Sequence, residues 1–326
     1  MTLPAPVVAI GGENLIDRVQ TGARNGVPVF ANNPGGSPFN VAIAAARQGA
    51  NVHYLSPIST DAMGDLLVAR MDEAGVSMGS SRRREPTTMA TVTLKDGVPS
   101  YDFRRANTAE RAVTVQSIRA AMPRHPAALH IGSLALAGGA DAEAWASAFV
   151  TAHEGGVFTS LDPNIRPALI AEPAAYRARL GTLFRAADLI KLSDEDLAWL
   201  YPDTPLSSAL DRLRGATDAA LVILTKGADG AVGLTQHHRV VVAAHRVVTL
   251  RDSIGAGDTF MGTLLAQLAA SNSLSGHTLG ALDVPAITAL LERAALAAAL
   301  NCEKEGCNPP ARSDIDAAVT QGNPNR

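Results

Sequence analysis

The segment RDSIGAGDTFMGTLLAQL (residues 251–268) combines residue types that can bind and activate an oxyanion. Gly255, Ala256 and Gly257 are small, and Asp258 follows them directly. Apolar residues then recur at helical spacings, which predicts a helix with Asp258 in its first turn. The first N–H groups of a helix lack internal partners and carry the positive end of its dipole, so a bare turn there can hold a phosphate. An acidic helix cap beside a glycine turn is the alternative interpretation.

Further polar residues follow the predicted strands, at the edge of a parallel sheet where ligands collect. Carboxylates and amides near the first two strands suit a polyhydroxylated ligand, which needs many short hydrogen bonds. Glycine turns in the second half of the chain suit a nucleotide, whose phosphates need open backbone N–H groups. Each cluster alone also fits an ordinary turn or cap, so their common placement is what favours a site. The clusters are Glu13, Asn14 and Asp17; NPGGSPFN (33–40); LDPNIRP (161–167); KLSDED (191–196); and TKGADG (225–230).

Helix-like and strand-like segments alternate along most of the chain, which predicts an α/β fold with a mainly parallel sheet. One helix is expected over 37–50, with Ser37 as its N-cap, Pro38 in its first turn and Gly49 at its end. A second helix is expected to end at Gly75. Buried strands are expected at VVAI (7–10), NVHYLSPI (51–58), ALHIGS (128–133), VFTSLD (157–162), DLIKL (188–192) and ALVILT (220–225).

One region departs from this alternation of helices and strands. TMATVTLKDGVPSYDFRR (88–105) alternates around Asp96–Gly97, which is a hairpin signal. The hairpin is expected to form a small flap beside the main sheet, and a flap that closes over a site excludes water from the reaction. An edge hairpin without a functional role is the alternative.

The composition excludes several classes of protein. The chain has 326 residues, 47% of them hydrophobic and 18% charged, with a formal net charge of −3. This balance gives no electrostatic case for nucleic acid or an anionic membrane. The longest apolar stretch is broken by Glu292–Arg293, and the chain lacks a basic and apolar leader, so we expect a cytoplasmic protein. Cys302 and Cys307 are expected to be free thiols, with metal or redox chemistry as the alternative.

Two common nucleotide-binding patterns are absent. The sequence holds no GxxxxGK[ST], so it does not encode a P-loop enzyme. After Gly255 and Gly257, the dinucleotide pattern GxGxxG requires a glycine at position 260, which is Phe260. This mismatch argues against a dehydrogenase.

At this point the sequence resembles the ribokinase-like (PfkB-type) carbohydrate kinases. PGGSPFNVAIAAARQGA resembles the amino-terminal signature of the family, and DSIGAGDTFMGTLL resembles its highly specific carboxy-terminal signature. The similarity spans roughly residues 7–310. Within the family, GGENLIDRV, YDFRRANTAER, LHIGSLAL, LDPNIRP and KLSDEDLAWL look most like bacterial fructokinases. The resemblance implies a single three-layer α/β domain over 1–326, with helices on both faces of the sheet and a β-lid formed by about 14–32 and 86–110.

The resemblance also implies phosphoryl transfer from ATP with Mg²⁺ to a primary hydroxyl of a sugar, most simply fructose. Asp258 would be the base, and the N–H groups of Gly255, Ala256, Gly257 and Asp258 would stabilise the transferring phosphoryl group. The implied sugar contacts are Asp17, Gly35, Gly36, Asn40, Arg105 and Arg166. The implied nucleotide contacts are Ser193, Thr225, Gly227, Gly230 and Asn301. Asp252 and the Ile254 carbonyl match positions that hold a monovalent cation such as K⁺ in relatives.

Two departures from the family pattern bear on this expectation. The Asn-x-x-Glu motif that organises Mg²⁺ through water reads Ser193-Asp194-Glu195-Asp196, so Asp196 would take the place of the glutamate. Arg104 stands where an aromatic residue is usual, which could favour an anionic sugar. Kinases of 2-keto-3-deoxygluconate, ribose or a nucleoside are the alternatives, and a non-catalytic sugar sensor is a further one. By analogy with the family, we expect a homodimer.

Overall fold

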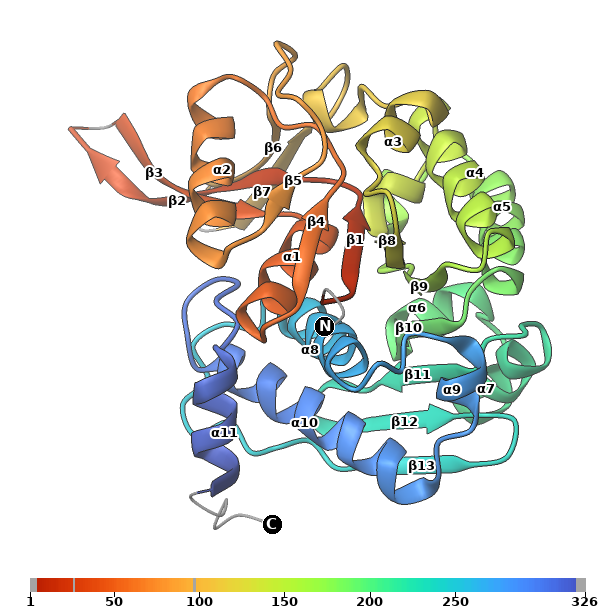
Figure 1. Cartoon of the computed structure of the whole chain (residues 1–326). Helices are drawn as coiled ribbons and strands as arrows, with labels where there is room; N and C mark the ends of the chain where they lie inside the picture. Colours follow the sequence, from red (N-terminus) through yellow and green to blue (C-terminus); the bar gives the residue numbers. More distant parts are fainter. Residues whose placement is uncertain (1–4, 26, 96–97, 321–326) are drawn as a thin grey trace.

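The computed structural model describes residues 5–25, 27–95 and 98–320. In this part of the chain a nine-stranded sheet has the order β13-β12-β11-β10-β9-β8-β1-β4-β5 (Figure 1). The strands from β11 to β5 pair in parallel, and β12 and β13 add an antiparallel edge. The strands are β1 (Val7–Gly11), β4 (Asn51–Tyr54), β5 (Ser77–Met78), β8 (Pro126–Gly132), β9 (Phe158–Asp162), β10 (Leu189–Ser193), β11 (Leu221–Thr225), β12 (Ala231–Leu234) and β13 (Arg239–Val242).

Helices cover both faces of this sheet, and each face has its own apolar core. This arrangement confirms the predicted three-layer α/β fold. The first core includes α1 (Ser37–Arg47), α2 (Ala62–Ala74), α8 (Ala256–Ala270) and α10 (Val284–Cys302). The second includes α3 (Val115–Ala121), α4 (Ala140–Glu154), α5 (Pro173–Arg185), α6 (Asp194–Leu200) and α7 (Leu206–Gly215). The remaining helical elements are α9 (Gly276–Gly280), α11 (Arg312–Thr320), η1 (Ala109–Arg111), η2 (Ser133–Leu136), η3 (Pro167–Leu169) and η4 (Gly227–Asp229).

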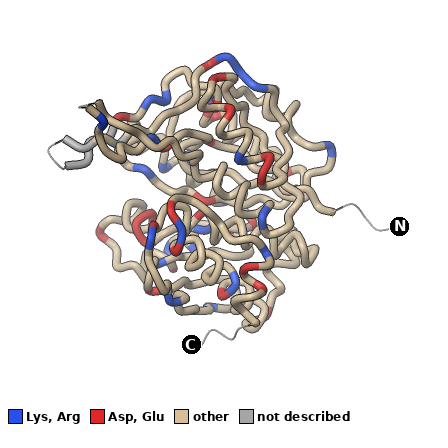
Figure 2. The backbone as a smooth tube through the Cα atoms, turned by 90° about the vertical axis from the view of Figure 1, so that its left-hand side faces the viewer, with Lys and Arg blue, Asp and Glu red and all other residues tan. Residues whose placement is uncertain are grey.

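Helix α10 is the one helix in the described ranges that is long and apolar enough to cross a membrane. It packs against α8, β12 and β13, and Leu291 and Ala294 on its inner face are fully buried in the first core. These contacts are those of a core helix in a globular protein, and length and composition are weak evidence for anything else. Acidic and basic residues are interspersed along the chain in Figure 2, in keeping with the small net charge.

A second sheet, which we call the lid, lies beside the main one. It has the order β3-β2-β6-β7, built from β2 (Leu15–Arg24), β3 (Val27–Gly35), β6 (Thr88–Lys95) and β7 (Val98–Arg104). Strands β6 and β7 pair antiparallel as predicted, while the expected turn at Asp96–Gly97 lies outside the described residues. The long pair β2 and β3 was not expected from the local pattern of residues, and it extends away from the main body in Figure 1. Because β3 runs to Gly35, the lid leads directly into α1.

The start of α1 differs from the prediction. Its N-cap is Gly36, with φ 104°, and Ser37 is already helical. A Cβ on Gly36 would lie 2.6 Å from the Glu13 carbonyl oxygen, so a side chain there would collide with the backbone. The hydroxyl of Ser37 therefore does not cap α1, and it donates to Asp258 in α8 instead. Gly75 ends α2 in the left-handed conformation, with φ 75°, as predicted.

Candidate active site

The glycine turn before α8 leaves several backbone amides open. Gly255 is the N-cap, with φ 74°, and a Cβ there would collide with Sγ of Cys307. Ala256 N–H donates to the Ser253 carbonyl at 3.2 Å, so this member of the predicted group is already engaged. In the described part of the chain, the N–H groups of Gly255, Gly257 and Asp258 have no acceptor. Together with the helix dipole, these amides form a cradle suited to an anion.

Asp258 lies at this turn, but it does not cap its own helix. Its Oδ1 accepts from the Ser37 hydroxyl at 2.7 Å, and its Oδ2 accepts from Asn40 Nδ2 at 2.8 Å. Both partners belong to α1, so the helix-cap interpretation of Asp258 is wrong. Asn40 thus holds the carboxylate through its Nδ2, and its predicted contact with a sugar stays a prediction. Ser37 was not foreseen as a site residue.

The protonation of Asp258 reflects two opposing influences. Burial of the carboxyl raises its pKa. The hydrogen bonds from Ser37 and Asn40, together with the charges of Lys191 and Arg166, lower the pKa and offset part of the burial effect. The net effect is a raised pKa for Asp258, which is the direction that a general base requires.

Asp17 and Gly35 meet at the base of the lid. A Cβ on Gly35 would lie 2.5 Å from Asp17 Oδ2, so only glycine lets this carboxylate lie against the backbone. Burial and the nearby charge of Asp258 raise the pKa of Asp17 to about 6. The charge of Asp258 thus acts on Asp17, and the role of Asp17 toward a sugar stays a prediction.

Glu13, which follows the first strand, joins the loops around this region. Its Oε1 accepts from Ser37 N at 3.1 Å and its Oε2 from Ala135 N at 3.3 Å. The side chain is 1% exposed, and burial raises its pKa to about 7. Glu13 thus ties the start of α1 to η2 and holds Ser37 in place for Asp258.

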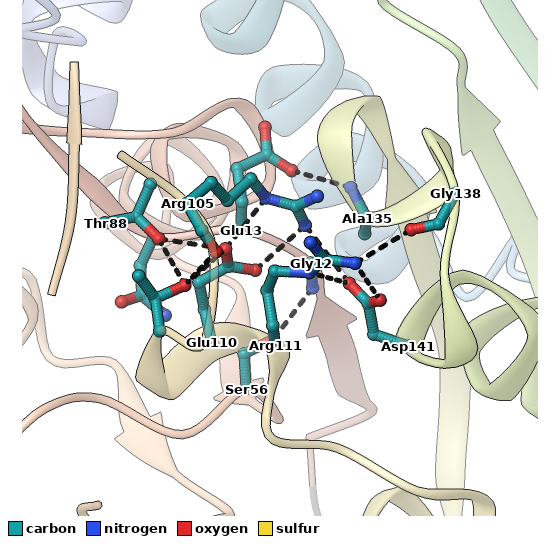
Figure 3. A network of polar contacts seen from close by, with 12 residues as sticks. Gly12, Glu13, Ser56, Thr88, Arg105, Glu110, Arg111, Ala135, Gly138 and Asp141 are labelled. Carbon is teal, nitrogen blue, oxygen red and sulfur yellow. Dashed lines mark hydrogen bonds and ion pairs between the residues drawn. The ribbon is translucent and has the colours of Figure 1, made fainter. Parts of the chain in front are cut away.

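Arg105 is less free than its predicted role in sugar binding suggests. Its Nε and Nη2 donate to Glu110 at 2.8 and 3.1 Å, and Nη2 also reaches Asp141 at 3.4 Å. Arg111 completes the network by pairing with Asp141 at 2.6 Å (Figure 3). The network connects the end of β7 in the lid to the start of α4 in the main body. Its two cations and two anions compensate each other.

The other two arginines predicted near the sugar behave differently from each other. Arg166 is exposed. Among the residues that the structure describes, its guanidinium bonds only to backbone carbonyls, at 3.1 and 3.4 Å, and its charge lowers the pKa of Asp258. Arg104 pairs with Asp102 at 2.8 Å, and its side chain is 78% exposed. An arginine this exposed and already paired gives no support to the expectation that position 104 selects an anionic sugar.

The predicted nucleotide contacts gather at the ends of β10 and β11. Ser193 and Thr225 are neighbours in the register of these two strands. Gly227 and Gly230 follow with φ 51° and 84°, and a Cβ on Gly230 would collide with the Val242 carbonyl. Gly230 donates its N–H to the Gly227 carbonyl at 3.2 Å, and its carbonyl accepts from Lys226 N at 2.8 Å, so the turn is held by its own backbone. The nucleotide contacts expected here stay predictions.

Two predicted contacts turn out to be structural supports. Asn301 is fully buried, its Nδ2 donates to the Ile254 carbonyl at 2.8 Å and its Oδ1 accepts from Asn308 N at 2.9 Å. It shapes the loop before α8, and its contact with a nucleotide stays a prediction. Asp252 accepts from the N–H groups of Ile254 and Gly306, both at 3.0 Å, while the Ile254 carbonyl already accepts from Asn301. The monovalent-cation site stays a prediction.

Asp196 does not fit the predicted magnesium role well. The side chain is 4% exposed, and its two carboxylate oxygens accept from Ile165 N at 2.6 Å and Ser193 N at 2.9 Å. It completes the capping box of α6 with the N-cap Ser193 and anchors the loop after β9. The residues that the structure describes hold no cluster of three metal-ligating side chains. We therefore derive no step through a protein-bound magnesium ion.

A cavity of about 590 Å³ opens beside the lid. It lies between the end of β7 and the loops that follow β8 and β9, and among the predicted site residues Arg105 alone lines it. Phe103, Leu134 and Leu169 give it apolar walls. The cavity adjoins the region that Arg105 and Glu13 organise, while Asp258 lies at the other end of that region.

Comparison with known proteins agrees with this geometry. The model of the pfkB family of carbohydrate kinases matches residues 7–314. The chain belongs to this family. It is 34% identical over 279 residues to a fructokinase from Rhizobium leguminosarum bv. trifolii, covering 85% of this chain and 84% of that protein. It is 29% identical to a probable fructokinase-3 of Arabidopsis thaliana, covering 94% and 88%.

Solved structures give the same result. The fructokinase from Xylella fastidiosa with bound ATP superposes with a TM-score of 0.85 at 27% identity, covering 97% of this chain and 99% of that chain. These matches confirm the family and the ribokinase-like fold that the sequence motifs indicated. This carbohydrate kinase is fructokinase-like in sequence. The roles of its individual site residues remain predictions.

Proposed function

We propose that this carbohydrate kinase transfers the γ-phosphoryl group of ATP to a primary hydroxyl of a neutral monosaccharide, with fructose as the first acceptor to test. The observation that carries the proposal is the position of Asp258, beside the open amides of α8 and held by Ser37 and Asn40. Asp258 takes the proton of the hydroxyl, whose oxygen bonds to the γ-phosphorus. The bond from this phosphorus to its bridging oxygen breaks, and the electron pair leaves with ADP.

The charges around the lid favour a neutral acceptor. Arg105 is compensated by Glu110 and Asp141, and Arg104 is turned to solvent with Asp102. An acidic sugar would need an uncompensated cation, because a carboxylate or phosphate that leaves water must be paired. Neither lid arginine offers one, and Arg166, which donates to two backbone carbonyls, is the cation that the acceptor panel tests. The carboxyl of Asp17 would instead accept from sugar hydroxyls, and the similarity to fructokinases points to fructose.

ATP is proposed as the donor because the chain belongs to the pfkB family and a similar fructokinase binds ATP. Mg²⁺ would reach the site mainly on the ATP phosphates, where it would neutralise charge. K⁺ is proposed at Asp252 and the Ile254 carbonyl, by resemblance to the family; Gly306 N and Asn301 Nδ2 hold these two groups in the loop before α8. ATP as the donor also fits a cytoplasmic location.

A homodimer through the lid would cover Val27 and Val29, which are 65% and 44% exposed on β3, and sedimentation would test it.

The decisive experiment is an acceptor panel with coupled detection of ADP. It compares fructose, ribose, 2-keto-3-deoxygluconate and a nucleoside at fixed ATP and Mg²⁺. We expect the highest kcat/KM with fructose. A kcat/KM more than about tenfold higher with the acidic sugar, a gap of roughly 1.4 kcal/mol in transition-state binding, would refute a neutral acceptor. Sugar binding without ADP release would instead support the sensor alternative.

A further inference from the structure

Buried polar side chains form a row on the face of the main sheet that α8 covers. The row runs across three neighbouring strands: His130 on β8, Ser160 and Asp162 on β9, and Lys191 on β10. Alternate residues of a strand share a face, and apolar neighbours on this face, such as Leu189, belong to the core beneath α8. Polar groups in such a position cost free energy unless they are fully satisfied. The row therefore requires an explanation.

Lys191 and Asp162 are the charged members of the row. Lys191 is 5% exposed and Asp162 is fully buried. Lys191 Nζ donates to Asp162 Oδ2 at 2.8 Å, while Oδ1 of Asp162 is buried without a hydrogen-bond partner in the described part of the chain. A buried ion pair that is incompletely satisfied contributes little to stability, and apolar residues of similar size often replace such pairs without loss. Stability alone does not account for this pair.

Its location suggests a reason. A Cβ built on Gly257 would lie 2.9 Å from Lys191 Nζ, so the ammonium group lies directly against the glycine turn of α8. Gly257 is one of the residues whose backbone N–H lacks an acceptor among the described residues. Burial lowers the pKa of Lys191, but attraction to Asp162, the hydrogen bond to it, and the charges of Asp196 and Asp258 outweigh burial and raise the pKa overall. The amine is therefore a cation at neutral pH.

We propose that Lys191 Nζ is the cation that stabilises the transferring phosphoryl group at the α8 turn, with Asp162 as the residue that positions it. This inference rests on the proposed function, which places phosphoryl transfer at Asp258. While the acceptor oxygen bonds to the γ-phosphorus and ADP leaves, negative charge spreads over the non-bridging phosphoryl oxygens. Lys191 and the Gly257 amide oppose that charge from one side. Lys191 transfers no proton, because the hydroxyl proton goes to Asp258.

The test replaces the ion pair as a unit. Lys191→Met combined with Asp162→Leu removes both charges and leaves no unpaired group, so the protein should keep or raise its Tm. We expect kcat to fall by about 10²–10³, the usual loss when one electrostatic stabiliser is removed. KM for the sugar should stay within about threefold. Binding of ATP should weaken while binding of ADP, which has no γ-phosphate, should not change.

A matched control removes the neutral part of the same row. His130 Nδ1 and Ser160 Oγ lie 3.0 Å apart, and both residues are fully buried. His130→Leu with Ser160→Ala therefore deletes a buried polar pair on the same face without touching the charge at the turn. We expect this variant to keep kcat near the wild-type value. An equal loss of kcat in both double variants would show a packing effect and overturn the proposal.

The remaining outcomes separate this inference from the proposed function. A folded Lys191→Met/Asp162→Leu variant with kcat within threefold of wild type overturns the role of Lys191. If that variant does not fold, Asp162→Asn keeps the lysine but loosens it, and it should weaken ATP binding more than ADP binding. Equal weakening of both nucleotides overturns the proposal. Asp258→Asn is assayed alongside, because full activity in that variant would refute the proposed function itself.

Discussion

Replacing the proposed base by its amide tests the site most directly. Asp258→Asn keeps the shape of the side chain but removes the ability to take a proton. The contacts from α1 can adapt to the change. The carbonyl oxygen of the introduced amide can accept from Asn40 Nδ2, and the Ser37 hydroxyl can rotate to accept from its NH2 group, because a hydroxyl is both donor and acceptor. The substitution therefore leaves no buried group without a partner.

The expected magnitudes follow from this geometry. Two hydrogen bonds to a charged group become bonds between neutral groups, which weakens each bond, but a carboxylate no longer has to be buried. These effects oppose each other, so we expect the free energy of unfolding to change by no more than about 1 kcal/mol. A positioned general base contributes about 10²–10⁴ in rate, so kcat should fall by that factor. The fall corresponds to roughly 3 to 5 kcal/mol of transition-state stabilisation.

The assay measures kcat by coupled ADP release at saturating fructose and ATP, KM for fructose, and Tm. KM should change little, because the amide can still bond the hydroxyl. Asp258→Ala is the contrasting variant. It leaves the donors of Ser37 and Asn40 unpaired at a buried position, which costs about 1–3 kcal/mol for each, so its Tm should fall while that of Asp258→Asn does not. A kcat of Asp258→Asn within threefold of wild type would refute the assignment of the base.

Three further variants probe the supports of the site. Ser37→Ala removes a hydrogen bond that lowers the pKa of Asp258, so this pKa should rise. Because only the carboxylate form of Asp258 is active, the acid limb of the kcat/KM profile should move to higher pH. An unshifted limb would show that Ser37 does not tune the base. Arg105→Ala should raise KM for the sugar. It also removes the cation beside buried Glu110, so the free energy of unfolding should fall by about 3 kcal/mol in chemical unfolding. An unchanged midpoint of chemical unfolding would contradict a stabilising role of the network. Asp196→Ala should lower Tm, because two backbone N–H groups lose their acceptor, and a magnesium titration of its activity tests the weaker metal role.

The fold could be predicted from the sequence because its signals are local. The buried strands that begin at Val7, Leu189 and Leu221 appear as short apolar runs, and each ends at a polar cluster. Strands β2 and β3 gave no local signal because they lie half-exposed in the lid, where residues such as Arg18 and Val27 show no clean alternation. Strands β12 and β13 were also not predicted; they form the antiparallel edge of the main sheet, and β13 is exposed at Arg239 and Val241.

Site residues could be predicted only where a glycine or a charged residue interrupts the pattern of apolar residues. The turn at Gly255 and the carboxylate of Asp258 could be recognised because small residues and an acid precede an apolar helix. The partners of Asp258 could not be recognised, because Ser37 at the start of a helix has the same local sequence whether it caps α1 or bonds another helix. That choice depends on a tertiary contact between residues 221 positions apart. Lys191 within the apolar run DLIKL was an overlooked local signal.

The surroundings of Asp258 account for how one carboxylate can be both buried and basic. A reaction that must exclude water needs the base out of solvent, and burial alone would protonate it, since burial raises the pKa. Two donors from α1 and the charges of Lys191 and Arg166 oppose that effect. In the proposed mechanism Lys191, whose Nζ lies against Gly257 at the α8 turn, also faces the phosphoryl group. As Asp258 takes up the proton it loses its charge, and Lys191 becomes available to the charge that develops on the phosphoryl oxygens.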